Sequence, residues 1–262
     1  MCLMLPYKDD LASMEHLFFM LKAGGKCQRF CEHNGNSVVV MPGESSCATI
    51  HDKDIRIYCI SALMAARNRG KPLNRTVRFT AYDFLVSPNR PTTGANYNLL
   101  REFLCRIAGI RIVTSIKTGS YRQESNLGLL DKIDIIYKDE TDENNLIIAI
   151  EVTFPDWLYQ LIETQRVKTI LPDYFRLRKP LDRRIYELCG KQADWTVFLD
   201  LLHKKSGSTS TLYRFRQAIK ELVASNDLPD YRLQYYEKKD ITKEKPNFIN
   251  SVEKEKILSW AL

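Results

Sequence analysis

The chain has 262 residues, of which 44% are hydrophobic and 27% are charged, and its formal net charge is +7. These proportions are those of ordinary globular proteins and exclude disordered and fibrous classes, while the length allows one large domain or two small ones. The modest positive charge is compatible with a polyanionic partner.

Seven cysteines are scattered along the chain. An odd, unclustered set does not predict a disulfide framework, so we expect a reducing compartment. The first residues lack the basic start and long apolar stretch of a signal peptide, and no run approaches the ~18 apolar residues that span a bilayer. We therefore predict a cytoplasmic protein without a membrane partner.

Residues 1–47 carry the weakest pattern and are left without an assigned domain. They predict one short helix over 10–22 and a strand over 38–41. A strong helical period then covers 52–69 and stops at a glycine. The next predicted elements are a strand over 77–79, a brief helix capped by Thr80, a loop over 87–91, and a helix from Thr93 or Asn96 to Gly109.

Three runs rich in β-branched residues follow, at 110–116, 133–137 and 146–152, and a polar turn joins the last two as a hairpin. Helix, strand, helix, helix and hairpin is the element order of a winged helix. Residues 48–154 are therefore predicted to form a first winged-helix domain.

The same order recurs over 155–237, which we predict to be a second winged-helix domain. Its expected elements are helices over 156–162 and from Pro180, a strand over 196–198, a helix over 199–203, a glycine turn, a helix over 209–224, and a strand over 231–236. The predicted fold class is α+β, with two tandem winged-helix domains that each have a helical core and a β-hairpin wing. A generic α+β domain is the alternative. Residues 238–262 form a tail in which 248–262 predict a short amphipathic helix.

The chain lacks the phosphate-loop, serine-hydrolase and zinc-protease motifs, so we predict no enzyme and no cofactor. Cys27, Cys31 and His33 are the best metal candidates. A closed zinc site needs a fourth ligand, and Cys47 would make an unusual one. We therefore predict unpaired thiols and no metal.

Asp134 and Glu151 fall on neighbouring predicted strands, as in nucleases whose two carboxylates hold Mg²⁺. Such a site wants a lysine two residues after the glutamate, where this chain has Thr153. Alternation along a half-exposed strand explains both acids more simply. A metal-dependent nuclease remains the weaker alternative function.

The most informative stretch is 201–220, which contains five lysines and arginines and no acidic residue. On a helical wheel, Leu212, Phe215, Ile219, Leu222 and Val223 make one apolar stripe, and polar and basic residues lie opposite. Such a helix suits the major groove, where Arg and Lys pair with guanine and Gln with adenine. The predicted DNA-binding residues are Lys204, Lys205, Ser208, Ser210, Tyr213, Arg214, Arg216, Gln217, Lys220 and Arg232.

Within that set, we expect Tyr213, Arg214 and Gln217 to read bases. We expect phosphates to be held by Lys204, Lys205, Ser208, Lys220 and Arg232, and by free backbone N–H groups in the turn that follows the two lysines. A second basic cluster, Lys168 and Arg176–Lys179 with Arg183 and Arg184, is expected to meet the adjoining DNA backbone. The corresponding helix of the first domain has a mixed surface of Asn98, Arg101, Glu102 and Arg106.

Three segments, Asp173–Leu177, Pro180–Leu188 and Leu201–Ser208, resemble the replication initiator protein A family of bacterial plasmids. Arg78–Leu85 is similar to the N-terminal signature of that family. The resemblance extends from about Ala48 to Tyr236 and so covers most of the chain.

The resemblance implies a plasmid replication initiator that binds repeated origin sites in a sequence-specific way and recruits a host initiator and helicase. In the wider group of such initiators, the first winged helix mediates self-association and backbone contact, and the second reads bases. Origin duplex DNA, host replication proteins and a second copy of the chain are therefore the expected partners. A winged-helix transcriptional repressor without replication activity is the alternative.

Overall fold

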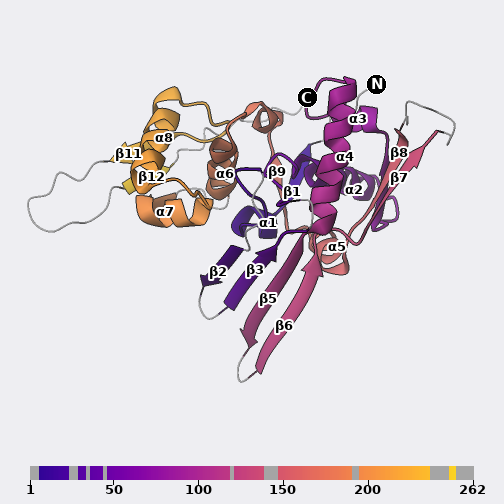
Figure 1. The fold of residues 1–262 in the computed structure, drawn as a ribbon, viewed down its shortest axis with the longest axis horizontal. Helices are drawn as coiled ribbons and strands as arrows, with labels where there is room; N and C mark the ends of the chain where they lie inside the picture. The colour runs from indigo at the N-terminus through magenta and orange to yellow at the C-terminus, as the bar shows by residue number, and fades with distance from the viewer. Residues whose placement is uncertain are drawn as a thin grey trace, which may run out of the picture. The chain divides into compact units, whose positions relative to one another are not determined.

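The computed structural model describes residues 6–23, 29–33, 36–43, 46–118, 121–138, 147–190, 195–236 and 248–251. The chain divides into two compact units, Met1–Pro172 and Asp173–Leu262. Helices and sheets alternate in both units, so the fold is mixed, as predicted (Figure 1). No helix in the described ranges is long and apolar enough to cross a membrane.

The first unit contains β1 (Tyr7–Asp10), α1 (Leu11–Glu15), β2 (Arg29–His33), β3 (Asn36–Met41), α2 (Asp54–Asn68), β4 (Thr76–Phe79), α3 (Ala81–Val86), α4 (Gly94–Gly109), β5 (Arg111–Thr118), β6 (Tyr121–Gly128), β7 (Lys132–Tyr137), β8 (Ile147–Thr153), α5 (Asp156–Glu163) and β9 (Val167–Ile170). Its core takes fully buried side chains from several of these helices and strands, among them Ile60, Phe84, Leu104, Ile150 and Leu158. The elements predicted over 52–109 are present because their apolar residues recur at the helical or strand period and meet in this core.

Local capping explains where the short helix α3 begins. The Thr80 hydroxyl accepts a hydrogen bond from the Asp83 backbone N–H at 3.0 Å and donates to the Asp83 carboxylate at 2.7 Å. This reciprocal arrangement satisfies a backbone donor that the first turn of a helix leaves free. The prediction that Thr80 caps this helix is confirmed.

The boundary between the units differs from the predicted one at residue 155. Residues 155–172 belong to the first unit, because Leu158 and Ile162 of α5 are buried in its core and β9 pairs antiparallel with β1. The predicted helix over 10–22 is also shorter than expected. Residues 7–10 form the strand that pairs with β9, and Asp10 ends it by capping α1 through the Ser13 N–H at 2.8 Å.

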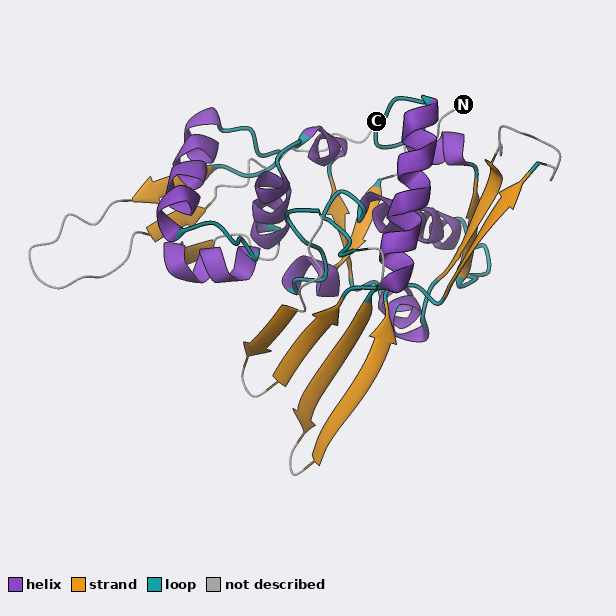
Figure 2. Cartoon of the chain, in the orientation of Figure 1, coloured by secondary structure: helices purple, strands orange, loops and turns teal. Residues whose placement is uncertain are grey.

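The strand β6 has no counterpart among the predicted elements. It forms a long antiparallel hairpin with β5, and β2 and β3 extend this hairpin to a four-stranded sheet in the order β2-β3-β5-β6. The four strands run side by side in Figure 2. Residues 1–47, left without a domain by the sequence, therefore contribute two strands to a sheet of the first unit.

The second unit contains a 3-10 turn η1 (Pro172–Arg176, whose first residue ends the first unit), α6 (Pro180–Cys189), β10 (Trp195–Phe198), α7 (Leu199–Ser206), α8 (Leu212–Ser225), β11 (Leu233–Tyr236) and β12 (Phe248–Ser251). The strand β12 lies between β10 and β11. The predicted helix over 248–262 is therefore wrong at Phe248–Ser251, where the backbone forms ladder hydrogen bonds with strands on both sides, and 252–262 lie outside the described residues.

The two units repeat one order of elements and one pattern of strand pairing. The series α2, β4, α3, α4, β7, β8 in the first unit corresponds to α6, β10, α7, α8, β11, β12 in the second. In each unit the strand before the helix pair joins the last strand of the hairpin, giving the sheets β4-β8-β7 and β10-β12-β11. This agrees with the internal repeat that the sequence predicts, and it makes α4 and α8 equivalent helices.

Candidate nucleic-acid interface

The helix α8 presents one apolar face to the core of its unit and leaves the opposite face in solvent. Phe215, Ile219 and Leu222 are buried, and Thr211 caps the helix by accepting from the Arg214 N–H at 3.4 Å. Leu212 was predicted to belong to the apolar stripe, but its side chain is 38% exposed. Leu212 is the first residue of α8, about one turn before Phe215, which is the first buried side chain of the stripe. No helical turn precedes Leu212 to cover its side chain.

The three predicted base-reading residues all lie on the exposed side of α8. Tyr213, Arg214 and Gln217 are exposed, and Tyr213 is the most exposed of the large hydrophobic side chains described, at 67%. Tyr213 and Gln217 are four residues apart and therefore stand on one ridge of the helix. The N-terminal half of α8 thus offers a phenol, a guanidinium and an amide to the same ligand.

The C-terminal half of α8 has a different character. Glu221 is exposed, lies 3.8 Å from Lys179 Nζ, and is followed by Asp227 just after the helix ends. Carboxylates at this end would repel a phosphate backbone. The arrangement therefore favours contact with a polyanion through the first two turns of α8.

The turn between α7 and α8 is closed by hydrogen bonds of its own. Gly207 adopts the left-handed conformation (φ 69°) that ends α7, and its N–H donates to the Lys204 carbonyl at 3.1 Å. The Ser208 N–H donates to Ser206 Oγ, and the Ser210 N–H donates to Ser208 Oγ, both at 3.3 Å. The backbone N–H groups of Gly207, Ser208 and Ser210, in the turn where we predicted free donors, are therefore engaged in hydrogen bonds within the turn.

Two predicted phosphate ligands, Lys204 and Lys205, end α7 just before this turn. Lys204 is exposed and Lys205 is half-buried. The backbone carbonyl of Lys205 accepts hydrogen bonds from Arg184 Nε at 3.4 Å and Nη2 at 3.2 Å. The end of α7 is thus held by a side chain from α6, which fixes where the lysines and the following turn stand.

Arg184 belongs to a buried polar network rather than to a DNA contact. Its Nη1 lies 3.2 Å from Glu187 Oε2, and the other carboxylate oxygen of Glu187 accepts from the Tyr174 hydroxyl at 3.0 Å. Arg183 is equally buried, donates to the backbone carbonyls of Leu177 and Phe175, and lies over the Tyr174 ring. The prediction that Arg183 and Arg184 meet DNA is wrong, because both guanidiniums are buried in hydrogen bonds that hold η1, α6 and α7 together.

Sequence reasoning missed Arg184, Glu187 and Tyr174 as positioning residues. The signal that was available is the Arg-x-x-Glu spacing of Arg184 and Glu187. It places both charges on one side of α6, beside Ile185, Leu188 and Cys189, where a buried charge is favourable only when it is paired.

The remaining predicted residues are Arg216 and Lys220 on α8 and Arg232 just before the strand β11. Lys220 Nζ stands 5.1 Å from the ring centroid of Tyr235 on β11, a cation–π contact that links α8 to this strand. Arg216 is half-buried, and its Nε has no hydrogen-bond partner within the part of the chain that the structure describes. Arg232 is exposed just before β11. The structure therefore places these three cations around the junction of α8 and β11.

The hydroxyl groups of Ser208 and Ser210 also form a hydrogen bond within the turn. Ser208 Oγ and Ser210 Oγ lie 2.9 Å apart, and the Ser210 carbonyl lies 2.9 Å from the His203 ring. His203 in turn packs against Phe215, with ring centroids 4.8 Å apart. The two serines thus lie close together just before α8, within a turn that is tied to the core.

The equivalent helix α4 of the first unit has a different surface. Asn98, Arg101 and Glu102 are exposed, whereas Arg106 is mostly buried and forms two 2.9 Å hydrogen bonds with Asp52. The hydrogen bond with Asp52 raises the pKa of Arg106. Of the charged residues predicted on the surface of this helix, only Arg101 and Glu102 are exposed, and their charges cancel. This face would therefore attract DNA less strongly than α8.

Asp134 and Glu151 do lie directly opposite each other on β7 and β8. Each carboxylate is paired with a cation on the same sheet, Asp134 with Lys132 at 2.7 Å and Glu151 with Arg78 at 3.0 Å. The hydrogen bond with Asp134 raises the pKa of Lys132. This ladder of alternating charge stabilises a solvent-exposed sheet face and leaves neither carboxylate without a counter-charge.

No group of three possible metal ligands lies together within the described ranges. Of the sequence candidates, Cys27 lies outside them, and only the backbone of Cys31 and His33 is described, in β2.

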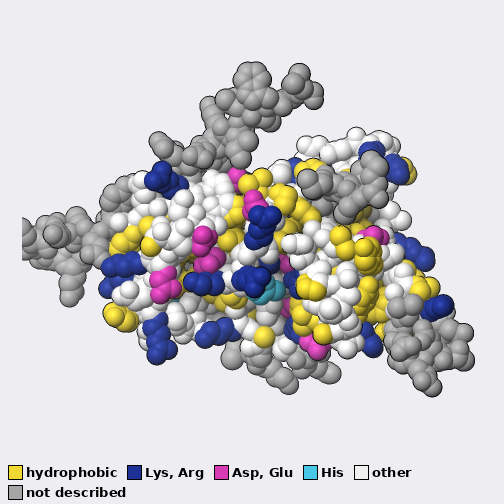
Figure 3. All heavy atoms as spheres, turned by 90° about the horizontal axis from the view of Figure 1, so that it is seen from above, with side chains coloured by type: hydrophobic (Ala, Val, Ile, Leu, Met, Phe, Trp, Pro, Cys, Tyr) yellow, Lys and Arg dark blue, Asp and Glu magenta, His cyan; other side chains and the backbone are white. Residues whose placement is uncertain are grey.

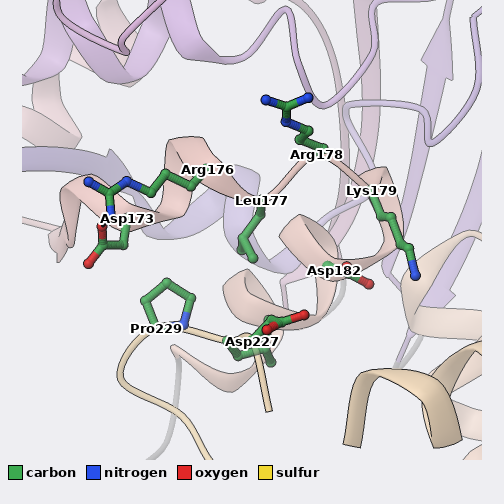
Figure 4. A pocket seen from close by; sticks show the side chains of 9 residues that line it. Asp173, Arg176, Leu177, Arg178, Lys179, Asp182, Asp227 and Pro229 are labelled. Carbon is green, nitrogen blue, oxygen red and sulfur yellow. Dashed lines mark ion pairs between the residues drawn. The ribbon is translucent and has the colours of Figure 1, made fainter. Parts of the chain in front are cut away.

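A pocket of about 500 Å³ opens near the C-terminal end of α8 (Figure 4). It is lined by both acidic and basic side chains and a few apolar ones, namely Asp173, Arg176, Leu177, Arg178, Lys179, Asp182, Asp227, Leu228 and Pro229. Burial, together with the nearby carboxylates of Asp227 and Glu221, raises the pKa of Asp182. Arg176, Arg178 and Lys179 of the second predicted basic cluster line this pocket together with three carboxylates, and none of the predicted DNA-binding residues of α7, α8 and β11 does.

Charges of both signs alternate over the molecular face shown in Figure 3. Among the residues drawn in colour there, Lys and Arg are interspersed with Asp and Glu. With a net charge of only +7, attraction of DNA must depend on local surfaces such as α8 more than on the total charge.

Comparisons with known proteins agree on one group. Residues 8–233 match the family model described as replication initiator protein A. The chain is 37% identical over 241 residues to a curated protein of Wigglesworthia glossinidia brevipalpis whose name is that of a replication protein, with 90% of this chain and 87% of the relative covered.

Two solved structures have a similar fold at low sequence identity. Domains 2 and 3 of RctB align with a TM-score of 0.65 and 11% identity over 88% of this chain and 92% of that one. The Pi initiator protein, crystallised in complex with iteron DNA, aligns with a TM-score of 0.54 and 15% identity over 78% of this chain and 91% of that one.

Proposed function

Since the chain belongs to the replication initiator protein A family, we propose that it starts plasmid replication by binding repeated duplex sites in an origin through α8. The observation that carries this proposal is the exposed N-terminal half of α8, with Tyr213, Arg214 and Gln217 outward and no acid until Glu221. The Pi initiator, which shares the fold, was crystallised on iteron DNA, and this supports a repeated site as the ligand.

We propose that each unit is a winged helix. The repeated element order and the hairpin that closes each three-stranded sheet support this description. In the second unit α8 would enter the major groove while Arg232 and the β11 hairpin reach the flanking backbone. The first unit, whose α4 carries little net charge, would contact the DNA backbone weakly and associate with a second copy.

Protomers bound side by side on repeats would bend and destabilise the duplex, with the deformation energy offset by phosphate and base contacts. Host initiator and helicase would then be recruited to the opened DNA in the cytoplasm. A repressor that binds the same sites without starting replication predicts identical binding, and it is distinguished by an origin clone that fails to replicate when the protein is supplied in a suitable host.

Binding should depend strongly on salt. The second unit offers six cations around α8, namely Lys204, Lys205, Arg214, Arg216, Lys220 and Arg232. If they neutralise about six phosphates, log K should fall against log salt with a slope of about −5. Fluorescence anisotropy with origin duplex at several salt concentrations measures this slope, and a slope near zero would contradict a phosphate-bound complex.

Arg214→Ala should weaken binding by roughly 1–3 kcal/mol and relax sequence preference at one base pair, because an exposed guanidinium on the reading face can pair with a guanine edge. Arg101→Ala on α4 is the matched control, since it also removes one exposed arginine from the equivalent helix. Binding titrations with single-base variants of the site compare them. Equal effects of the two variants would count against α8 as the reading helix.

We propose that the protein is not an enzyme. The pairing of Asp134 with Lys132 and of Glu151 with Arg78 supports this, because a two-carboxylate metal site needs its acids uncompensated. Incubation of supercoiled plasmid with the protein and Mg²⁺ should leave the plasmid intact. Nicking by the wild-type chain that disappears in Asp134→Asn would establish the nuclease instead.

A further inference from the structure

The first turn of α8 exposes two adjacent apolar side chains on the helix that is otherwise polar outward. Leu212 is 38% exposed and Tyr213 is 67% exposed. Tyr213 makes no ring contact or side-chain hydrogen bond with any other residue in the described ranges. Neither side chain belongs to the buried stripe of α8, which consists of Phe215, Ile219 and Leu222.

Single exposed hydrophobic residues are common and need no explanation. This pair differs because its members are contiguous, stand beside Arg214, and occupy the N-terminal turn, which enters the major groove most deeply when a recognition helix binds. The apolar surface therefore lies where base edges, rather than phosphates, would meet it.

The major-groove edges of the four base pairs carry one apolar group, the C5-methyl of thymine. A leucine and the carbon face of a tyrosine ring can bury that methyl, whereas the neighbouring guanidinium and amide need polar edges. Gln217 stands one helical turn, about 5.4 Å, beyond Tyr213 on the same ridge. Successive base pairs are about 3.4 Å apart, so the two side chains reach base pairs one or two steps from each other.

We propose that Leu212 and Tyr213 read thymine methyl groups, so that the duplex ligand of α8 carries thymine against its first turn, one or two base pairs from the pair read by Gln217. This inference rests on the proposed function, and it adds which base is recognised and which residues recognise it. It also gives the exposed Leu212, which the helical wheel assigns to the core, a role in specificity.

The experiment uses the full chain and a random duplex library, from which bound sequences are selected and one consensus duplex is synthesised. Each thymine of that duplex is then replaced in turn by deoxyuridine, which removes the methyl group and leaves every hydrogen-bonding group in place. We expect one or two positions per repeat at which the wild-type chain binds about fourfold more weakly, the effect of losing one buried methyl group.

Leu212→Ala and Tyr213→Ala should each bind the thymine duplex more weakly and lose most of the sensitivity at one of these positions. Both side chains are exposed, so neither variant should unfold. Arg214→Ala should weaken binding to both duplexes while keeping their ratio. Leu99→Ala, which removes a similarly exposed leucine from α4, should change neither the affinity nor the ratio.

Equal affinity of the wild-type chain for the thymine duplex and every deoxyuridine duplex would overturn this inference and leave the proposed function standing. Sensitivity to deoxyuridine that persists in both Leu212→Ala and Tyr213→Ala would overturn it as well, because other residues would then read the methyl. Failure of the selection to enrich any sequence would instead contradict the proposed function.

Discussion

Replacing Glu187 by alanine should lower the free energy of unfolding of the second unit by about 3–5 kcal/mol, because it leaves a buried guanidinium without its counter-charge. The side chains of Arg184 and Glu187 are 4% and 2% exposed, and the same carboxylate accepts the Tyr174 hydroxyl at 3.0 Å. Urea unfolding followed by tryptophan fluorescence and circular dichroism measures the loss.

The matched control is Lys179→Ala, which breaks an exposed pair with Glu221 at 3.8 Å. Exposed pairs contribute little, so this variant should change stability by less than about 1 kcal/mol. Similar losses in Glu187→Ala and Lys179→Ala would contradict the buried network as a source of stability.

A double variant of Arg184 and Glu187 should recover stability without recovering DNA binding. When both members of a buried pair are replaced by apolar residues, stability is often largely retained. Arg184→Leu with Glu187→Leu should therefore recover much of the stability lost in Glu187→Ala. It should still bind origin DNA more weakly than the wild type at a temperature where both are folded, because the Lys205 carbonyl at the end of α7 then loses its two hydrogen bonds from Arg184.

Regular periodicity made most helices predictable. The helices α2, α4, α6 and α8 were expected within a few residues of their observed bounds, because each carries an apolar stripe of several turns and a clear stop signal. The repeat of strand and helix pair across the two units followed from the same local patterns.

Elements defined by distant partners were missed. The strand β1 pairs with β9, at the other end of the first unit, and β12 completes a sheet with strands that precede it by many residues. The edge strand β6 has the sequence Tyr-Arg-Gln-Glu-Ser-Asn-Leu-Gly, without alternation of apolar and polar residues. Most of its described side chains are exposed, so it needs few apolar residues. Local sequence does not show such pairings, which is why residues 155–172 were not expected to pack with the first unit.

The candidate site shows the same limit at the level of side chains. The positions of Tyr213, Arg214 and Gln217 followed from the helical period. The positions of Arg183 and Arg184 did not, because a charge pattern gives the sign of a residue but not whether the backbone carbonyls of Leu177 and Lys205 will accept hydrogen bonds from it. Much of the segment that carries the family resemblance thus supports α8 rather than forming the exposed face of that helix.

The second large effect is expected in the first unit, where Asp10→Ala should lower the free energy of unfolding by about 3–5 kcal/mol. Asp10 and Arg56 are fully buried, with Arg56 Nη2 2.9 Å from the carboxylate, and Asp10 also caps α1. Removal of Asp10 would leave the buried Arg56 guanidinium without this ion pair. Its Nε and Nη1 have no hydrogen-bond partner among the residues described. Asp156→Asn, at an exposed pair with Arg75, is the control with a small expected effect.

The loss in Asp10→Ala should also depend on pH. Burial alone would raise the pKa of Asp10, but the charges of Arg56 and Lys53 and the hydrogen bonds from Ser13 outweigh it, so this pKa lies below the ordinary 3.8. The unfolded chain then binds a proton more readily than the folded one, and the stability contributed by Asp10 is present above pH 3.8 and declines as the pH falls through the lowered value. Urea titrations from pH 6 downward should show the difference between wild type and Asp10→Ala shrinking only below pH 3.8. A difference that stays constant over that range would mean that packing and capping, rather than the charge of Asp10, hold β1 against α2.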